Sequence, residues 1–317
     1  MKPQRIASLL ASATEILYGL GLGEKIVAVS HECDFPPEVA GKPRVTFTRI
    51  AANASSAEID RQVTQRVAAG KPIYNIDAEG LAALRPDLIV TQAQCEVCAV
   101  SHDDVLRAVQ DHGALKETVV VSLNATTLDE IFEDIIRVGE AAACPAEAQA
   151  YVTDLRERVE VVRAKAASAA ATHRPRVVCI EWIEPVMVAA NWMPELIELA
   201  GGQSGLTNSG ARSRYTAWDD VLAYDPEVVV VMPCGFDLPR TLDEARNLPK
   251  LRKWSKLTAV RTERVYAVDG NAYFNRSGPR IIDSLEILAE LIHPTVFDDA
   301  ERSRAGIVAK LTGAAPS

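Results

Sequence analysis

Four cysteines and one histidine stand in loops that directly follow predicted strands; they are His31, Cys33, Cys95, Cys98 and Cys234. Thiolate and imidazole are soft ligands that suit zinc, copper or iron, and the Cys-x-x-Cys pair of Cys95 and Cys98 is a common half of a metal site. The same pair is also a candidate redox-active dithiol. Because the sequence holds no second Cys-x-x-Cys, a complete metal site needs Cys33, His31 or Cys234 from other loops. Ordinary polar or packing roles stay open as a third interpretation.

The remaining two cysteines, Cys144 and Cys179, are expected to be buried. Cys179 lies in the apolar run 177–180, and Cys144 precedes Pro145 at a predicted helix boundary. Free cysteine in such positions behaves as a small hydrophobic residue. Six cysteines among 317 residues are too few to staple a small secreted scaffold, so cysteine usage favours a reducing compartment.

Strands and helices alternate in the pattern that would place these loops together. Short β-branched runs alternate with helical patterns, which predicts βα units and parallel sheets. Most of the runs are apolar throughout, as expected of strands covered by helices on both faces. The predicted strands are residues 26–30, 88–91, 119–123, 177–180, 186–189, 228–232 and 265–269. Ligands in such folds bind beyond the carboxyl ends of the strands, so the cysteine-bearing loops are expected at one cleft.

One long helical pattern covers residues 145–171 and divides the chain. It begins at Pro145, which suits a first helical turn, and would span roughly 40 Å. Because this is longer than a usual crossover helix, we interpret it as a rigid connection between two lobes. The predicted organisation is an N-terminal α/β lobe at 1–144, a linking helix at 145–173 and a C-terminal α/β lobe at 174–317.

The two halves echo each other. Residues 84–90 and 224–230 each combine a helix end, a proline turn and an apolar strand, and residues 119–123 match 265–269 at a similar offset. The pattern predicts two similar lobes, although any α/β chain could show such echoes. The first half also holds an additional segment, residues 46–75, with a predicted helix that is either a lid over a cleft or a surface excursion.

Aromatic rings and amides form a second group of loop residues in the C-terminal half. Trp182 and Trp192 flank predicted strands, and Tyr273, Phe274 and Asn275 follow the last one. Only 5% of the chain is aromatic, so this concentration in loops is informative. Flat rings beside amides suit a large, flat, partly polar ligand. The alternative is that each ring packs a hinge or a contact between lobes.

Composition excludes several classes of protein. The chain is 48% hydrophobic and 24% charged, with a mean hydropathy of +0.02, which is typical of a globular protein of about two domains. A net charge of −9 provides no basic field for nucleic acid, and no apolar run reaches the roughly 18 residues of a membrane span. We expect neither a nucleic-acid partner nor membrane insertion.

Enzyme signatures are weak. Gly19, Gly21 and Gly23 end a predicted helix instead of following a strand, so they do not form a nucleotide fingerprint. The sequence has no P-loop lysine, serine elbow or His-Glu-x-x-His helix. These observations favour a binding protein over an enzyme.

The opening residues imitate a signal peptide only superficially. Lys2 and Arg5 precede the apolar run 6–10 and the small residues 11–13. That run is shorter than the expected apolar region of a signal peptide, and a helical pattern continues beyond it. We expect a cytoplasmic protein as the sequence stands, or a periplasmic or extracellular one if an upstream signal is missing.

The order of several motifs resembles a known family. Residues 7–17, the run 26–30 and the turn Asp34-Phe35-Pro36-Pro37 are similar to the opening of cobalamin-binding proteins, which are helical-backbone (class III) periplasmic substrate-binding proteins of ABC importers. The resemblance extends over most of the chain, through the long helix to residue 291. It implies an α/β fold in which two Rossmann-like lobes with parallel sheets are joined by one long α-helix.

The resemblance also implies a ligand, cobalamin or a related corrinoid, held in the interlobe cleft without chemistry. It places Ser12 to Thr14, the loop from His31 to Phe35, and Tyr273 with Phe274 against that ligand. Together with the loop residues above, the candidate ligand-binding set is Ser12, Ala13, Thr14, His31, Cys33, Phe35, Cys95, Trp182, Trp192, Cys234, Tyr273, Phe274 and Asn275. The alternative is a protein that handles a metal, haem or an iron chelate, or a thiol redox protein, through the cleft cysteines.

Members of the family carry an acidic residue at the tip of each lobe, which meets arginines of the permease. Glu79 and Asp219 occupy the matching places, ahead of the helices that end at Leu84 and Tyr224. The cysteine-bearing loops are not part of the general family pattern; their roles stay open between coordination of cobalt from one axial side, binding of another metal, and handling of a ligand after uptake. The predicted partners are a small-molecule corrinoid and an ABC importer permease.

Overall fold

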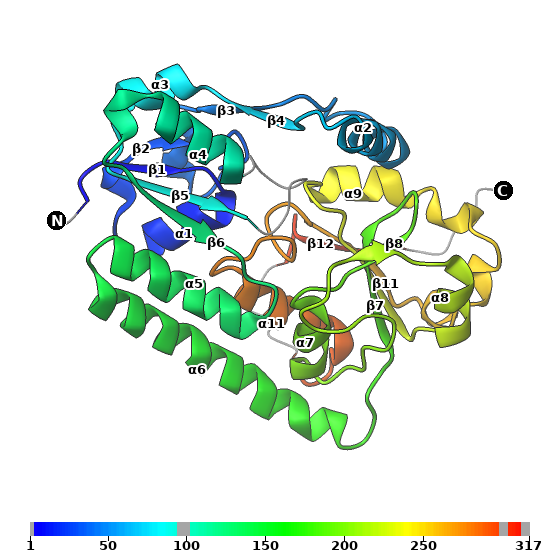
Figure 1. The fold of residues 1–317 in the computed structure, drawn as a ribbon. Coiled ribbons are helices and arrows are strands. Elements are labelled where there is room, and N and C mark those ends of the chain that lie inside the picture. Colours follow the sequence, from blue (N-terminus) through cyan, green and yellow to red (C-terminus); the bar gives the residue numbers. More distant parts are fainter. Residues whose placement is uncertain (1–2, 94–101, 298–303, 312–317) are drawn as a thin grey trace.

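Two α/β lobes lie side by side, and one long helix runs along both of them (Figure 1). This computed structural model describes residues 3–93, 102–297 and 304–311. Each lobe has its own sheet, and the central strands of both sheets are parallel. The predicted fold class is therefore confirmed.

The sheet of the first lobe has four parallel strands in the order β2-β1-β5-β6. They are β1 (Ile6–Ser8), β2 (Ile26–Val29), β5 (Leu88–Gln92) and β6 (Val119–Leu123). The sequence analysis missed the inner strand β1, because three apolar residues before a helix carry no strand signal of their own. The helices of this lobe include α1 (Ala11–Gly19), α3 (Ala78–Leu84), α4 (His102–Asp111) and α5 (Leu128–Ala141).

The second sheet has six strands in the order β12-β11-β10-β7-β8-β9. They are β7 (Val177–Trp182), β8 (Met187–Val188), β9 (Arg214–Tyr215), β10 (Val228–Val231), β11 (Val265–Val268) and β12 (Val308–Lys310). Strands β8, β9 and β12 pair antiparallel at the two edges, which corrects the expectation of a purely parallel sheet. The α-helices include α7 (Met193–Leu199), α8 (Trp218–Tyr224), α9 (Leu238–Ala245), α10 (Thr258–Arg261) and α11 (Ile281–Ile292).

Both lobes use the same helix-turn-strand arrangement before an inner strand. Helix α3 is followed by Arg85 and helix α8 by Asp225, both with a left-handed backbone (φ 45° and 46°), and a proline then leads into β5 or β10. The Nε atom of Arg5 donates to the last carbonyl of α3 (2.7 Å), and that of Arg176 donates to the last carbonyl of α8 (3.0 Å). A cation at a helix C-terminus is favourable, so the predicted echo between these segments has the same physical basis in each lobe.

Helix α6 (Pro145–Ala170) confirms the predicted connection between the lobes. Its buried residues recur every three or four positions and join a hydrophobic core that continues from the first lobe into the second. Next to this buried face, Arg158 contacts Asp283 (2.5 Å) and Glu286 (3.0 Å) of α11. None of the helices in the described part of the chain combines the length and apolar character needed to cross a membrane.

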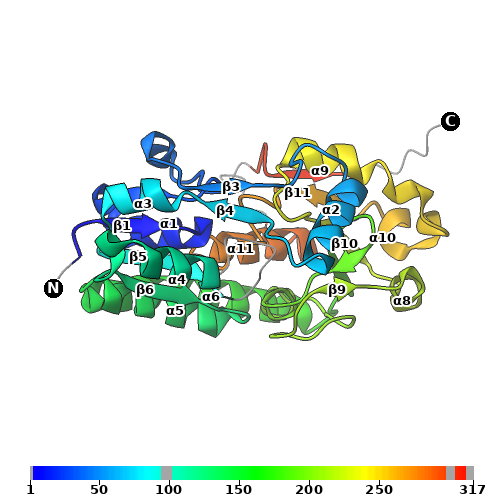
Figure 2. The same cartoon turned by 45° about the horizontal axis from the view of Figure 1, so that its top comes forward.

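Residues 46–76 form a unit that extends away from the first sheet. Strands β3 (Thr46–Thr48) and β4 (Tyr74–Ile76) pair antiparallel, and helix α2 (Ser56–Ala68) lies between them in sequence. Ser55 accepts a hydrogen bond from the Glu58 backbone (3.3 Å), as its capping position predicts, and Gly70 adopts a positive φ of 61° just past the helix end. Figures 1 and 2 show that α2 lies beyond its own lobe, close to α9 and β9 of the second.

Candidate functional site

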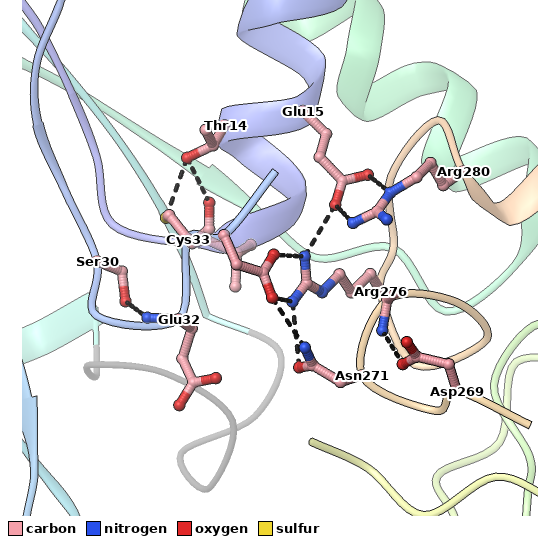
Figure 3. A network of polar contacts seen from close by, with 12 residues as sticks. Thr14, Glu15, Ser30, Glu32, Cys33, Asp269, Asn271, Arg276 and Arg280 are labelled. Carbon is pink, nitrogen blue, oxygen red and sulfur yellow. Dashed lines mark hydrogen bonds and ion pairs between the residues drawn. The ribbon is translucent and has the colours of Figure 1, made fainter. Parts of the chain in front are cut away.

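The two lobes meet at a buried ion-pair network (Figure 3). Glu15 of α1 accepts hydrogen bonds from Arg280 (2.6 and 3.0 Å) and Arg276 (3.1 Å), which belong to the second lobe. Glu15 is only 2% exposed, and the two arginines are 13% and 9% exposed. Charges removed from water in this way are costly unless they stay paired. The network therefore favours one arrangement of the lobes at this edge.

Asp34 extends the network to the loop that follows β2. Arg276 donates to both of its carboxylate oxygens (2.7 and 2.9 Å), and Asn271 Nδ2 donates to one of them (2.8 Å). Burial raises the pKa of Asp34, but the bonds and charge of Arg276 outweigh it, so the net pKa is lowered. Burial disfavours the charged form of Arg276, yet its carboxylate partners raise its pKa overall. Both arginines at this edge are thus balanced by carboxylates of the first lobe.

The carboxyl ends of the second sheet present aromatic and polar side chains. The half-buried Trp182 at the end of β7 has its ring 5.3 Å from that of Phe236, and Cys234 is exposed in the loop after β10. Ser213 donates to the Glu181 carboxyl group (2.5 Å), but burial raises the pKa of Glu181 despite this bond. This end of the lobe offers a ring, a thiol and a carboxyl group that takes up a proton more readily than usual.

His31 lies at the carboxyl end of the first sheet, in the loop that follows β2. Its Nδ1 atom lies 2.7 Å from Thr46 Oγ1, and its Nε2 atom lies 3.1 Å from a carboxylate oxygen of Glu32. The His31 backbone N–H also donates to Thr46 Oγ1 (3.0 Å), and the imidazole lies 5.4 Å from the ring of Tyr74. The contact at Nδ1 orients the ring.

Six of the predicted ligand residues are buried; they are Ser12, Ala13, Thr14, Cys33, Trp192 and Phe274. Thr14 Oγ1 donates to Cys33 Sγ (3.0 Å) and lies 2.7 Å from Ser8 Oγ, because the tight turn between β1 and α1 places these groups together. Trp192 Nε1 donates to the Phe274 carbonyl (2.8 Å). Burial raises the pKa of Cys33 to about 11. In this structure these six side chains are packed inside the protein, and their contact with a ligand stays a prediction.

Phe35, Tyr273 and Asn275 lie at the edge of the network. Phe35 is 40% exposed, and the Arg280 guanidinium lies 4.1 Å from its ring centre and 5.4 Å from that of Tyr273. Asn275 Nδ2 donates to the carbonyls of Met232 (2.8 Å) and Gly270 (2.9 Å). The asparagine therefore holds its own loop in shape, whereas the two rings flank a cation.

The predicted metal ligands Cys95 and Cys98 lie outside the described residues. Within residues 3–93, 102–297 and 304–311, no group of three or more His, Cys, Asp or Glu side chains is arranged to hold a metal ion. Cys33 is fully buried and its sulfur accepts a hydrogen bond from Thr14, so its thiol is not exposed in this structure. A metal or redox site on Cys95 and Cys98 stays a prediction.

The sequence analysis missed the charged residues that join the lobes. Glu15 carried a detectable signal in the sequence, because it is the only charged residue between Arg5 and Glu24 and a charge in an apolar helix needs a partner. Its partners Arg276 and Arg280 are 261 and 265 residues away. Nothing in the local pattern could identify them.

Two surface hollows flank the contact between the lobes. One, of about 520 Å³, is lined by Tyr18, Phe35, Tyr151 and neighbouring residues, and the other, of about 740 Å³, lies between α5, α6 and α7. Neither is lined by His31, Trp182 or Cys234. Of the predicted ligand residues that the structure describes, Phe35 alone lines one of these two hollows.

Two lobes with parallel sheets, connected by a single long helix and meeting at the carboxyl ends of their strands, define a bilobal solute-binding fold. Residues 6–272 match the profile of the periplasmic binding protein family. The chain therefore belongs to that family, whose members bind a small-molecule ligand for an ABC importer.

Relatives and solved structures agree with this assignment. The chain is 28% identical to the vitamin B12-binding protein of Vibrio cholerae over 89% of this chain and 87% of that protein. It is 26% identical to an uncharacterized ABC transporter substrate-binding lipoprotein of Bacillus subtilis, over 94% and 82% of the two chains. A periplasmic heme-binding protein from Pseudomonas aeruginosa has the same fold, with a TM-score of 0.70, 21% identity and coverage of 92% and 94%.

Proposed function

We propose that the protein binds a corrinoid, cobalamin or a close relative, between its lobes and delivers it to an ABC importer. The observation that carries the choice of ligand is the neutralisation of Arg276 and Arg280 by Glu15 and Asp34. Haem propionates and anionic iron chelates are recognised by unpaired basic groups, whereas the peripheral amides of a corrinoid need neutral donors and acceptors. The similarity to a vitamin B12-binding protein supports the same choice.

Separate titrations with cyanocobalamin and with haemin test the ligand. Calorimetry and visible absorbance should give a dissociation constant for cyanocobalamin below about 10 μM, with haemin at least about tenfold weaker. Tighter binding of haemin would instead favour the haem or iron-chelate alternative. The absorption spectrum of the protein as isolated provides an independent check, because a corrinoid, a haem and a ferric chelate absorb differently.

For the importer, we propose that Glu79 and Asp219 contact the permease. Each is the second residue of a seven-residue helix, α3 or α8, and each is exposed. Their equivalent positions in the two helix-turn-strand units support a role at equivalent tips of the lobes. The compartment is also a proposal: binding for an importer requires the protein outside the cytoplasmic membrane, and fractionation of the cells that produce it tests this.

A further inference from the structure

The unit formed by residues 46–76 crosses from the first lobe to the second. Ser56, the first residue of α2, donates from its backbone N–H and its hydroxyl to the carboxylate of Glu244 on α9 (3.2 and 2.7 Å). Trp182 Nε1 donates to the Ser56 carbonyl (3.3 Å). A carboxylate at a helix N-terminus satisfies free amides and interacts favourably with the helix dipole. The start of α2 is thus bound by the opposite lobe.

Two further side chains of the second lobe hold the same segment. Arg240 donates to the carbonyl of Ala52 and to that of Ala54 (2.7 Å), and its guanidinium lies 3.6 Å from the centre of the Phe236 ring. The Tyr215 hydroxyl donates to Asp60 (2.6 Å). We refer to Trp182, Tyr215, Arg240 and Glu244 as the latch residues.

The remainder of α2 has little packing of its own. Ser56 is the only buried residue of the helix, and Val67 near its end is 54% exposed. Its attachment to the second lobe therefore depends on polar contacts that water can replace, and not on a shared apolar core. Such an attachment can open without unfolding either lobe.

The latch lies at the carboxyl ends of the second sheet. Trp182 ends β7, and Phe236, which packs against it, follows β10. Ligands of this class of fold bind at these strand ends. We propose that α2 is a gate for the ligand: the latch residues hold it closed over the strand ends of the second sheet, and its release admits and frees the ligand. The proposed gating rests on the proposed ligand function, whereas the docking of α2 does not.

The latch itself is tested by amide hydrogen exchange on the full-length protein without ligand. The double variant Tyr215→Phe with Glu244→Ala removes the bonds to Asp60 and Ser56. Exchange of residues 56–66 should become at least about tenfold faster, with the sheets unchanged. The matched control is Asp243→Asn on α9, the helix that carries Glu244. The Asp243 side chain is 69% exposed and forms a surface ion pair with Arg246. Equal exchange in the double variant and the control would overturn the latch.

The gating role is tested by stopped-flow binding of cyanocobalamin, and of haemin in parallel. The double variant should increase both the association and the dissociation rate several-fold, with a smaller change in the dissociation constant, since the gate affects passage more than contact. Faster exchange of α2 with unchanged binding rates would overturn the gate while leaving the latch. If neither probe binds the wild-type protein, the corrinoid assignment fails and the gate for these ligands fails with it, but the exchange result still decides whether the latch exists.

Discussion

Replacing Glu15 with glutamine tests whether the buried network holds the lobes together. The variant keeps the size of the side chain but removes the carboxylate partner of Arg280 and leaves Arg276 with Asp34 alone. Breaking a buried ion pair on one side costs about 3–5 kcal/mol, because the remaining charge is left without compensation. Arg280 is 13% exposed and stacks on Phe35, so we expect a loss at the lower end, about 3 kcal/mol.

Thermal and urea unfolding measure that loss. A change of about 3 kcal/mol lowers the melting temperature of a protein of this size by about 6 °C. The control Glu160→Gln removes an exposed ion pair with Arg163 on α6 and should leave the midpoint unchanged. A wild-type midpoint for Glu15→Gln would refute the reasoning. If the stranded charge is the cause, adding Arg280→Met to the variant should recover part of the loss.

Three further predictions follow from the same contacts. Cys33 should resist alkylation at pH 8 until the protein unfolds, since it is buried with a pKa of about 11; peptide mass spectrometry checks this, and rapid labelling in the native protein would contradict it. Because the pKa of Asp34 is lowered in the folded protein, its stabilising effect is present above its unfolded pKa of about 4 and is lost as the pH falls through the folded value. Asp34→Asn should therefore be less stable than wild type at pH 7. Urea unfolding should show this difference in stability becoming smaller toward pH 3. Glu79→Lys and Asp219→Lys should reduce uptake of the ligand by cells while leaving the affinity of the protein for the ligand unchanged. The control, Glu263→Lys at an exposed position, should change neither quantity. Weaker ligand binding by the first two variants would argue against a role at the permease.

Much of the fold was predictable because its signals are local. The long helix, the capped start of α2 and the β-branched strands each depend on residues close in sequence, and their observed limits differ from the predictions by a few residues. Strand β1 was missed because three residues are too few to show the alternation of apolar and polar positions that marks a strand. Strand β8 was predicted at residues 186–189, whereas β9 and β12 were missed. The antiparallel direction of all three was not foreseen, because pairing direction is decided by tertiary contacts that short runs do not encode.

The candidate site was less predictable than the fold. The strand-end loops drew attention to His31, Trp182 and Cys234, whose contact with a ligand stays a prediction, and the same reasoning did not foresee that Cys33 and Phe274 are buried. Every loop residue able to bind a ligand or react was given the same weight. The turn geometry of each loop, however, decides whether a side chain faces the cleft or the core. The contacts of the latch could not be inferred either, since the bond between Ser56 and Glu244 spans 188 residues.

Helices α3 and α8 repeat in the two lobes, whereas the unit at residues 46–76 belongs to the first lobe alone. This difference suggests different tasks for the two features. The arginine-capped helices α3 and α8 occur in both lobes and carry exposed acidic residues, so they suit a partner that contacts both lobes in the same way. The two tips differ in one respect: Asp219 is paired with Arg252, so in the proposed docking a permease arginine would compete with that pair in the second lobe. The unit at residues 46–76 interrupts only the first lobe and is bound across the strand ends of the second. In the functions proposed above, this unit therefore acts on passage of the ligand, whereas the repeated helices act in docking.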